Sequence, residues 1–305
     1  MSRFQTILRL VLTASLAITS LAAPHVSRRA DGVTDTQLLQ FALTLEHLES
    51  TFYNQALDKF NDKAFADAGY ESWVRGRFEQ MRSHEQTHVD FLTKALGDAA
   101  PRACTYDFPY NDPKSFVALS MALETVGGSA YMGAAQFLQN KDTLTQAASI
   151  LAVESRHAAW AASAVLKGSP WDGSFETPLT VDGVYSLASQ FIVSCPSTNP
   201  TLIAKPLPKL TIEPTSPAAG QHIKFNFNHD EVKHDGDKLY AAWFDGITVH
   251  HTDLGDDDRA SIPQELQGTV YGAIVKTKES NPTKQDLLTG LVMFEIGFSS
   301  YAPNP

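Results

Sequence analysis

The sequence predicts a mainly α-helical protein with a separate β domain: a four-helix bundle with a fifth helix, followed by a small antiparallel β-sandwich. Apolar residues recur at helical spacing from Asp35 to Cys195, and short β-rich runs separated by turn residues occupy the last third of the chain. Between these regions, prolines recur too often for a helix to form. The chain has 305 residues with 43% hydrophobic content, which is enough apolar material for both domains.

Residues 1–22 are predicted to be a cleaved secretory signal. Two arginines precede an apolar run that is shorter than the roughly 20 residues needed to span a bilayer, and small residues end the run at Ala22. Residues 23–34 should form a flexible N-terminus, in which Arg28-Arg29 is either a second processing site or an exposed basic pair. No later stretch is apolar and long enough to span a membrane, so we expect a secreted protein, extracellular or in the cell wall.

Five helices are expected in the bundle domain, residues 35–195. Asp35 is a plausible N-cap for the first, Gly97 stops the second, and Pro113 suits the first turn of the third. The expected ranges are about 35–60, 72–96, 112–138, 142–166 and 181–194.

The β domain is expected over residues 209–305, after a proline-rich linker at residues 196–208. Its predicted strands are short runs rich in β-branched and aromatic residues, bounded by turn signals. These runs are residues 222–227, 239–244, 247–250, 269–275 and 291–298.

The chain has two cysteines, Cys104 in the long connection between the second and third helices and Cys195 at the end of the fifth. Secretion would place both in an oxidising compartment, where two lone cysteines usually pair. A Cys104–Cys195 bridge would fasten the C-terminal end of the bundle to that connection.

Two helices carry the same short motif, Glu85-x-x-His88 in the second and Glu154-x-x-His157 in the fourth. The spacing puts a carboxylate and an imidazole one turn apart on the same helix face. Because the chain contains ten histidines, one such motif alone would have little weight.

The helix before each motif carries a glutamate followed by a tyrosine seven residues later, Glu46 with Tyr53 and Glu124 with Tyr131. Seven residues is close to two helical turns, so each pair lies on one face. The order Glu…Tyr on one helix and Glu-x-x-His on the next therefore occurs twice in the chain. Four helices could bring four carboxylates and two imidazoles to one point, and these are ligands that two first-row metal ions need.

The surroundings of these acids argue for burial. Glu124 is the only charged residue between Ser115 and Asn140, and apolar residues flank Glu154. A lone carboxylate in so apolar a helix is costly to bury unless something compensates it. We therefore expect a buried site for two iron or manganese ions, with a polar core that holds no metal as the alternative.

Three further residues lie near the candidate ligands in the sequence, and spacing alone leaves their roles open. Glu49 lies three residues after Glu46, so it could reach the same core or pair with a neighbour, and we expect it in the layer around the ligands. His47 and His84 adjoin candidate ligands but lie off the ligand face. We expect both at the surface or in that second layer.

The order Glu, Glu-x-x-His, Glu, Glu-x-x-His is similar to that of the ferritin-like superfamily of carboxylate-bridged di-metal proteins. More narrowly, residues 41–53, 104–109 and 194–196 resemble secreted fungal ferritin-like proteins associated with stress response and late sexual development. The resemblance covers about residues 31–210. It implies that Tyr53 and Tyr131 donate hydrogen bonds to ligating carboxylates. The metal ligands that it implies are Glu46, Glu85, His88, Glu124, Glu154 and His157.

Other function classes find little support. The net charge of −10 argues against nucleic acid as a partner, and the chain has no nucleophile elbow, phosphate loop or dinucleotide fingerprint. Residues 250–259 are acidic but lack the spacing of a calcium loop, so we expect a solvated loop, with a divalent-ion site as the alternative.

Three functions remain. The first is a redox metalloenzyme that reacts with peroxide or dioxygen, like a catalase, peroxidase or ferroxidase. The second is a non-catalytic stress or cell-surface protein whose β domain binds a cell-wall or matrix partner. The third, a mineral-storing cage, is the weakest, because the β domain should obstruct subunit packing in a shell. The ligand set does not decide whether the chain is an enzyme.

Overall fold

The computed structural model describes residues 32–234 and 236–301. The predicted secretory signal and the Arg28-Arg29 pair lie outside the described residues. Contacts divide the chain into Met1–Gly32 and Val33–Pro305. Within the described residues, no helix is both long enough and apolar enough to cross a membrane.

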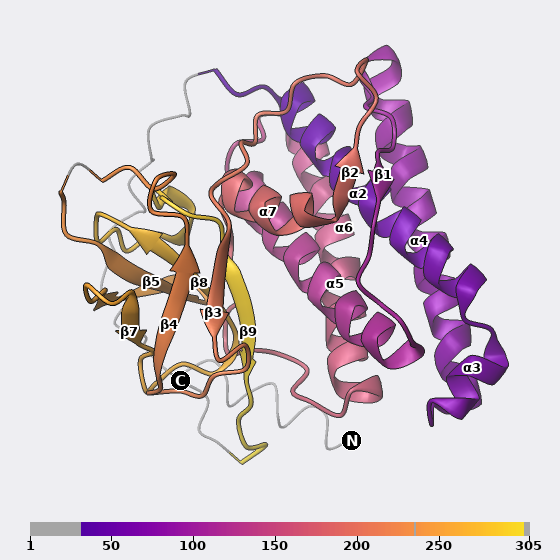
Figure 1. Ribbon diagram of the computed structural model, residues 1–305. Helices are drawn as coiled ribbons and strands as arrows, with labels where there is room; N and C mark the ends of the chain where they lie inside the picture. The colour runs from indigo at the N-terminus through magenta and orange to yellow at the C-terminus, as the bar shows by residue number, and fades with distance from the viewer. Residues whose placement is uncertain (1–31, 235, 302–305) are drawn as a thin grey trace, which may run out of the picture. The chain divides into compact units, whose positions relative to one another are not determined.

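Four long helices make up most of the first half of the described chain (Figure 1). α2 packs along α4, and α5 packs along α6, which continues into the π-helical turn η2 (Ala161–Val165). The four predicted ranges agree with the observed ones to within a few residues. The observed helices are α2 (Asp35–Lys59), α4 (Ser72–Leu96), α5 (Pro113–Ala135) and α6 (Lys141–Trp160).

The start of α2 differs from the prediction. Thr34, not Asp35, is the N-cap: its hydroxyl accepts from the Gln37 backbone N–H, and the Gln37 side chain accepts from the Thr34 N–H. Asp35 lies in the first turn and accepts hydrogen bonds from the backbone N–H groups of Gln139 and Asn140, at 2.8 and 2.9 Å. Its carboxylate therefore ties the start of α2 to the start of α6. Sequence spacing could not show this contact.

Short helices complete this region. α3 (Asp62–Asp67), which sequence analysis did not predict, follows Asn61, whose side chain caps it. The predicted fifth helix is shorter than expected, because α7 (Val181–Ala188) is followed by a 3-10 turn and then by strand β2 (Ile192–Ser194).

Strand β2 pairs antiparallel with β1 (Thr105–Tyr106). The β-branched pair Ile192-Val193 favours a strand over a helix at this point. The adjacent Cys104 and Cys195 form a disulfide across 91 residues of chain, which confirms the predicted pairing.

The remaining strands form two antiparallel sheets. One has the order β3 (Leu210–Glu213), β4 (His222–Phe227), β7 (Arg259–Ser261). The other has the order β6 (Thr248–Asp253), β5 (Tyr240–Asp245), β8 (Gly268–Val275), β9 (Val292–Ile296). The five predicted strands overlap β4, β5, β6, β8 and β9. Sequence analysis missed β3 and β7, which are only four and three residues long.

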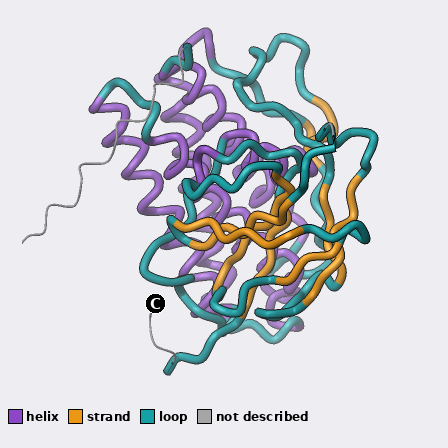
Figure 2. The backbone as a smooth tube through the Cα atoms, turned by 90° about the vertical axis from the view of Figure 1, so that its left-hand side faces the viewer, coloured by secondary structure: helices purple, strands orange, loops and turns teal. Residues whose placement is uncertain are grey.

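Strand β8 is buried along its whole length, and its side chains alternate between two apolar clusters. Val270 and Ile274 belong to the core that both sheets share. Tyr271 and Ala273 belong to a second cluster, which also contains Val126 and other residues of the helices. The β8 sheet therefore has an apolar core on each face, one of them shared with helices. Figure 2 shows where helices and strands run along the backbone.

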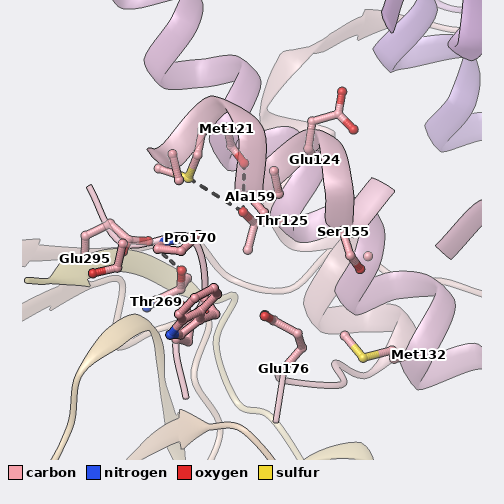
Figure 3. Close-up of a pocket in the computed structure, with 16 residues that line it drawn as sticks. Met121, Glu124, Thr125, Met132, Ser155, Ala159, Pro170, Glu176, Thr269 and Glu295 are labelled. Atoms are coloured by element: carbon pink, nitrogen blue, oxygen red, sulfur yellow. Dashed lines mark hydrogen bonds between the residues drawn. The ribbon is translucent and has the colours of Figure 1, made fainter. Parts of the chain in front are cut away.

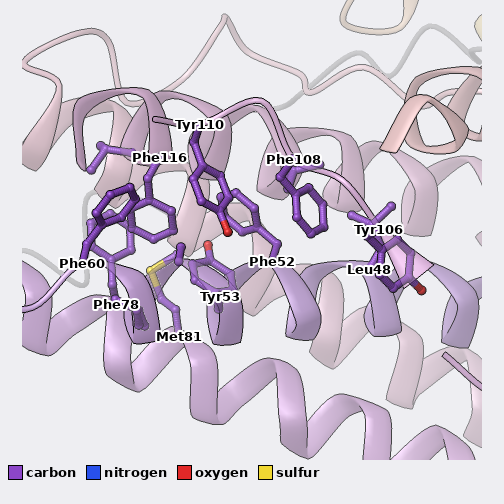
Figure 4. Packing of buried hydrophobic residues seen from close by; sticks show 14 of the residues in the cluster. Leu48, Phe52, Tyr53, Phe60, Phe78, Met81, Tyr106, Phe108, Tyr110 and Phe116 are labelled. Atoms are coloured by element: carbon purple, nitrogen blue, oxygen red, sulfur yellow. The ribbon is translucent and has the colours of Figure 1, made fainter. Parts of the chain in front are cut away.

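Aromatic side chains from several segments fill the helical core near α2 (Figure 4). The Phe116 ring lies 5.1 Å from that of Phe52 and 4.9 Å from that of Phe78, measured between ring centroids. Tyr53 packs against the rings of Phe78 and Phe116 and is fully buried. This packing holds the Tyr53 hydroxyl in place beside Glu124.

Candidate metal centre

The structure brings all six predicted ligands together between the four long helices. α2 and α5 each supply one glutamate, and α4 and α6 each supply a Glu-x-x-His pair. All four carboxylate residues have no exposed surface, and the two histidines are largely buried. The residues are Glu46, Glu85, His88, Glu124, Glu154 and His157.

These residues form two overlapping groups of potential ligands. Glu46 and His88 belong to the first group, Glu124 and His157 belong to the second, and both Glu85 and Glu154 belong to each. Within each group, one ligand atom per residue lies within 4.8 Å of the others. Because the two groups share Glu85 and Glu154, the cluster could hold a di-metal centre.

The Nδ1 atoms of both imidazoles face the carboxylates. His88 Nδ1 lies 3.2 Å from Glu46 Oε2, 3.1 Å from Glu85 Oε2 and 3.2 Å from Glu154 Oε1. His157 Nδ1 lies 3.0 Å from Glu124 Oε2 and 3.3 Å from Glu85 Oε1. The two oxygens of Glu85 thus face two different histidines.

Several carboxylate oxygens here are buried without any hydrogen bond: Glu46 Oε2, Glu85 Oε1 and both oxygens of Glu154. An unpaired buried carboxylate oxygen is costly, so something must compensate it. Burial, and after it the charge of Glu124, raises the pKa of Glu154 well above its usual range. Divalent cations would satisfy these oxygens, and a set of carboxylates with imidazoles suits iron or manganese. The residues present fit a di-metal centre.

Two tyrosines donate hydrogen bonds to the carboxylates that belong to only one ligand group, Glu46 and Glu124, which we call the outer carboxylates. Each tyrosine lies on the other helix of the α2–α5 pair. Tyr131 Oη on α5 donates to Glu46 Oε1 at 2.5 Å. Tyr53 on α2 donates to Glu124 Oε1, and its hydroxyl lies 2.7 Å from Ser120 Oγ. Burial, followed by the charge of the accepting glutamate, raises the pKa of both tyrosines, so both remain donors.

The comparison with known families agrees with this geometry. Residues 34–167 match a family model described as a ferritin-like domain. The matched region, residues 34–167, is therefore ferritin-like. The match begins at the N-cap of α2, ends just after η2, and includes all six predicted ligands.

A curated relative supports a wider similarity. The chain is 32% identical over 210 residues to protein rds1 of Schizosaccharomyces pombe. The aligned part is 68% of this chain and 50% of rds1, so the chain spans about half the length of that relative.

The residues with open roles surround the ligands of the ferritin-like domain. Glu49 is buried, with 5% exposure, but belongs to neither ligand group. His84 Nδ1 lies 3.0 Å from His157 Nε2, and the two rings stack with an interplanar angle of 9°. His47 Nε2 lies 3.1 Å from the Pro101 carbonyl oxygen. Both histidines therefore lie off the ligand groups, as expected, but no sequence spacing indicated the contact between His84 and His157.

A pocket of about 40 Å³ lies beside the centre, lined by residues of the ferritin-like domain, of the following loop and of strands β8 and β9 (Figure 3). Asp172, Glu176 and Glu295 form an acidic cluster in its wall, which sequence analysis missed. The Thr269 backbone N–H donates to Asp172 at 2.7 Å, and its hydroxyl donates to Glu295 at 2.6 Å. Burial, followed by the charge of Asp172, raises the pKa of Glu176 to about 7. No helical spacing links these acids, because they come from a loop and a distant strand.

Proposed function

We propose that the ferritin-like domain binds two iron or manganese ions and acts as a redox enzyme toward peroxide or dioxygen. The observation that carries this proposal is the pair of buried ligand groups that share Glu85 and Glu154. Iron or manganese bound there would supply a reversible change of oxidation state. The fold alone does not supply redox chemistry.

The tyrosines would prepare the outer carboxylates for this role. In Glu46, Oε1 accepts from Tyr131, whereas Oε2 has no hydrogen bond and faces His88. In Glu124, Oε1 accepts from Tyr53, whereas Oε2 faces His157. Each tyrosine thereby fixes one oxygen and leaves the other directed toward the ligand group. Such orientation by neighbouring groups typically strengthens metal binding.

The contact between His84 and His157 would orient the second imidazole. With His157 Nδ1 directed at the carboxylates, its Nε2–H would donate to His84 Nδ1, 3.0 Å away. This arrangement selects the tautomer in which Nδ1 carries the lone pair that a metal ligand needs.

The direct test is metal content, measured by elemental mass spectrometry on the full chain after a chelator wash and reloading. We expect about two iron or manganese ions per chain, and loss of both in the His88→Ala/His157→Ala variant. His47→Ala, which alters a histidine outside both groups, should retain them. Near-zero metal that added iron or manganese does not restore would overturn the proposal. Protein with two ions per chain would then be assayed with peroxide and with dioxygen.

We further propose that the protein is secreted and of the stress-response type, with residues 1–22 as its signal. We also propose domains at residues 35–195 and 209–305, joined by a linker at residues 196–208. The Cys104–Cys195 disulfide supports secretion, because such bonds persist in oxidising compartments. Mass spectrometry of protein from culture medium would test this. An N-terminus at residue 23 or 30 is expected, whereas purely intracellular full-length protein would contradict it.

A further inference from the structure

A second cavity of about 110 Å³ lies against a different face of α5 from the pocket of Figure 3. α5 contributes Leu123 and Gly127 to its lining, α7 contributes Ala188, and β9 contributes Met293. Its lining is apolar except for Glu49 and Gln190. We call it the apolar cavity.

Glu49 is the one charged side chain in this lining, and it is 5% exposed. Within the described part of the chain, it forms no hydrogen bond or ion pair. A buried carboxyl group without a hydrogen-bond partner is costly. Its presence in an apolar wall indicates that it pairs with a polar group of a bound molecule.

Gly127 shows how near this carboxyl group lies to the metal centre. A Cβ atom at residue 127 would come within 2.9 Å of Glu49 Oε1 and 3.4 Å of Glu154 Oε2. The two carboxylates therefore approach the same point on α5, and a side chain at residue 127 would require the Glu49 carboxyl group to shift. Glu154 belongs to both ligand groups, so Glu49 stands between the apolar cavity and the metal centre.

The size and lining of the apolar cavity indicate what it accepts. A dry, apolar cavity of about 150 Å³ is known to bind benzene or xenon, so one of similar size can hold a molecule of a few heavy atoms. Water would find few polar partners in this lining. A short aliphatic chain would contact the apolar walls, and one hydroxyl group would be enough to satisfy Glu49.

We propose that the apolar cavity binds a small aliphatic alcohol, with its hydroxyl group hydrogen-bonded to Glu49, and that it is the substrate site of the ferritin-like domain. Peroxide would there accept two electrons and two protons from the alcohol, which gives an aldehyde and two water molecules. Its role as a substrate site rests on the redox function proposed above, whereas alcohol binding itself does not require metal.

The methionines provide the readout. In protein with ¹³C-labelled methionine methyl groups, titration with 1-butanol should shift the Met293 signal saturably. Met121 and Met132 line the other pocket and provide internal controls whose signals should stay unchanged. Equal shifts at all three methionines would mean non-specific binding and would overturn the proposal.

Variants of the lining test the position of the ligand. Ala188→Leu should fill the apolar cavity and abolish the Met293 response, provided that circular dichroism shows a folded protein. Leu123→Ala should enlarge it, so that 1-hexanol binds at least about tenfold more tightly than to the unmodified chain. This second variant keeps the test decisive if Ala188→Leu does not fold. Unchanged responses in both variants would contradict the proposal.

Variants of Glu49 test the hydrogen bond. Glu49→Leu should weaken 1-butanol binding about tenfold, because the hydroxyl group loses its partner, whereas Glu49→Gln should restore most of the affinity. Equal affinity in Glu49→Leu, or tighter binding of n-butylammonium than of 1-butanol to the unmodified chain, would show that the ligand class is wrong.

The metal content of the same samples separates the two proposals. A Met293 response in a chain that binds no metal would retain the alcohol site and remove the redox function. A chain that binds two ions but shows no Met293 response would retain the redox function and remove the alcohol site.

Discussion

Tyr131 on α5 donates a hydrogen bond of 2.5 Å to Glu46 on α2, and Tyr53 on α2 donates in return to Glu124 on α5. Each half of the repeated Glu…Tyr pattern therefore completes the other half. The two outer carboxylates are oriented by residues 85 and 71 positions away in the chain, so the centre depends on correct packing of α2 against α5.

Removing one of these hydroxyl groups should weaken metal binding. Tyr131→Phe leaves Glu46 Oε1 without its donor, and the loss of such a partner typically costs about 10–100-fold in metal affinity. Competition with a chromogenic chelator would measure this. Tyr185→Phe is the matched control, because no hydrogen bond of its hydroxyl occurs among the described residues. Equal affinity in Tyr131→Phe and Tyr185→Phe would contradict the assigned role of Tyr131.

Glu124→Ala distinguishes a catalytic from a structural metal. The change removes one outer carboxylate and leaves the Tyr53 and Ser120 hydroxyl groups to pair with each other. If the centre is catalytic, we expect metal and activity to be lost while the protein remains folded and secreted. Metal content, thermal unfolding and the amount of secreted protein would show this. Loss of secretion itself would instead favour the non-catalytic alternative, in which metal serves stability.

Metal binding should release protons and strengthen as the pH rises. Burial lowers the pKa of His157, but the nearby carboxylates of Glu124 and Glu85 outweigh it and raise the pKa to about 10. His157 is therefore protonated at pH 7 in the metal-free protein, and a metal must displace that proton. Calorimetric titration in two buffers of different ionisation enthalpy would detect the release. Identical enthalpies in both buffers would rule it out.

The same pKa shift affects the stability of the metal-free protein. Because the folded-state pKa of His157 lies above its ordinary value of 6.5, its stabilising contribution is complete below pH 6.5 and is lost as the pH rises through about 10. Chemical unfolding of the metal-free chain between pH 6 and pH 10 would measure this loss, which His157→Ala should reduce.

Glu176→Gln should stabilise the protein at alkaline pH. Burial and the charge of Asp172 raise the pKa of Glu176 from its ordinary 4.5 to about 7, so the folded state loses stability as the pH rises from about 4.5 through about 7. After allowance for solvent screening, we expect a gain of about 1–2 kcal/mol at pH 8 and little change at pH 5. Thermal unfolding at both pH values would show it. Asp256→Asn, at an exposed turn, is the control, and equal effects of the two variants would refute the prediction.

Much of the helical region was predictable from sequence because its signals are local. Spacing of three and seven residues decides which helix face Glu85, His88 or Glu46 occupies, and glycine and proline mark where α4 ends and α5 begins. The end of the fifth helix was not predictable. It is decided by the pairing of β2 with β1, nearly 90 residues earlier in the chain.

The sequence by itself therefore determined which residues could act together: four glutamates and two histidines on matching helix faces, and two cysteines able to pair. Only the tertiary structure decided the partners: Tyr131 with Glu46, and His84 with His157. Only the tertiary structure, too, placed Glu49 between the ligands and the apolar cavity. The physical reason is that helical periodicity sets the direction of a side chain within its own helix. What it meets there depends on how distant segments pack.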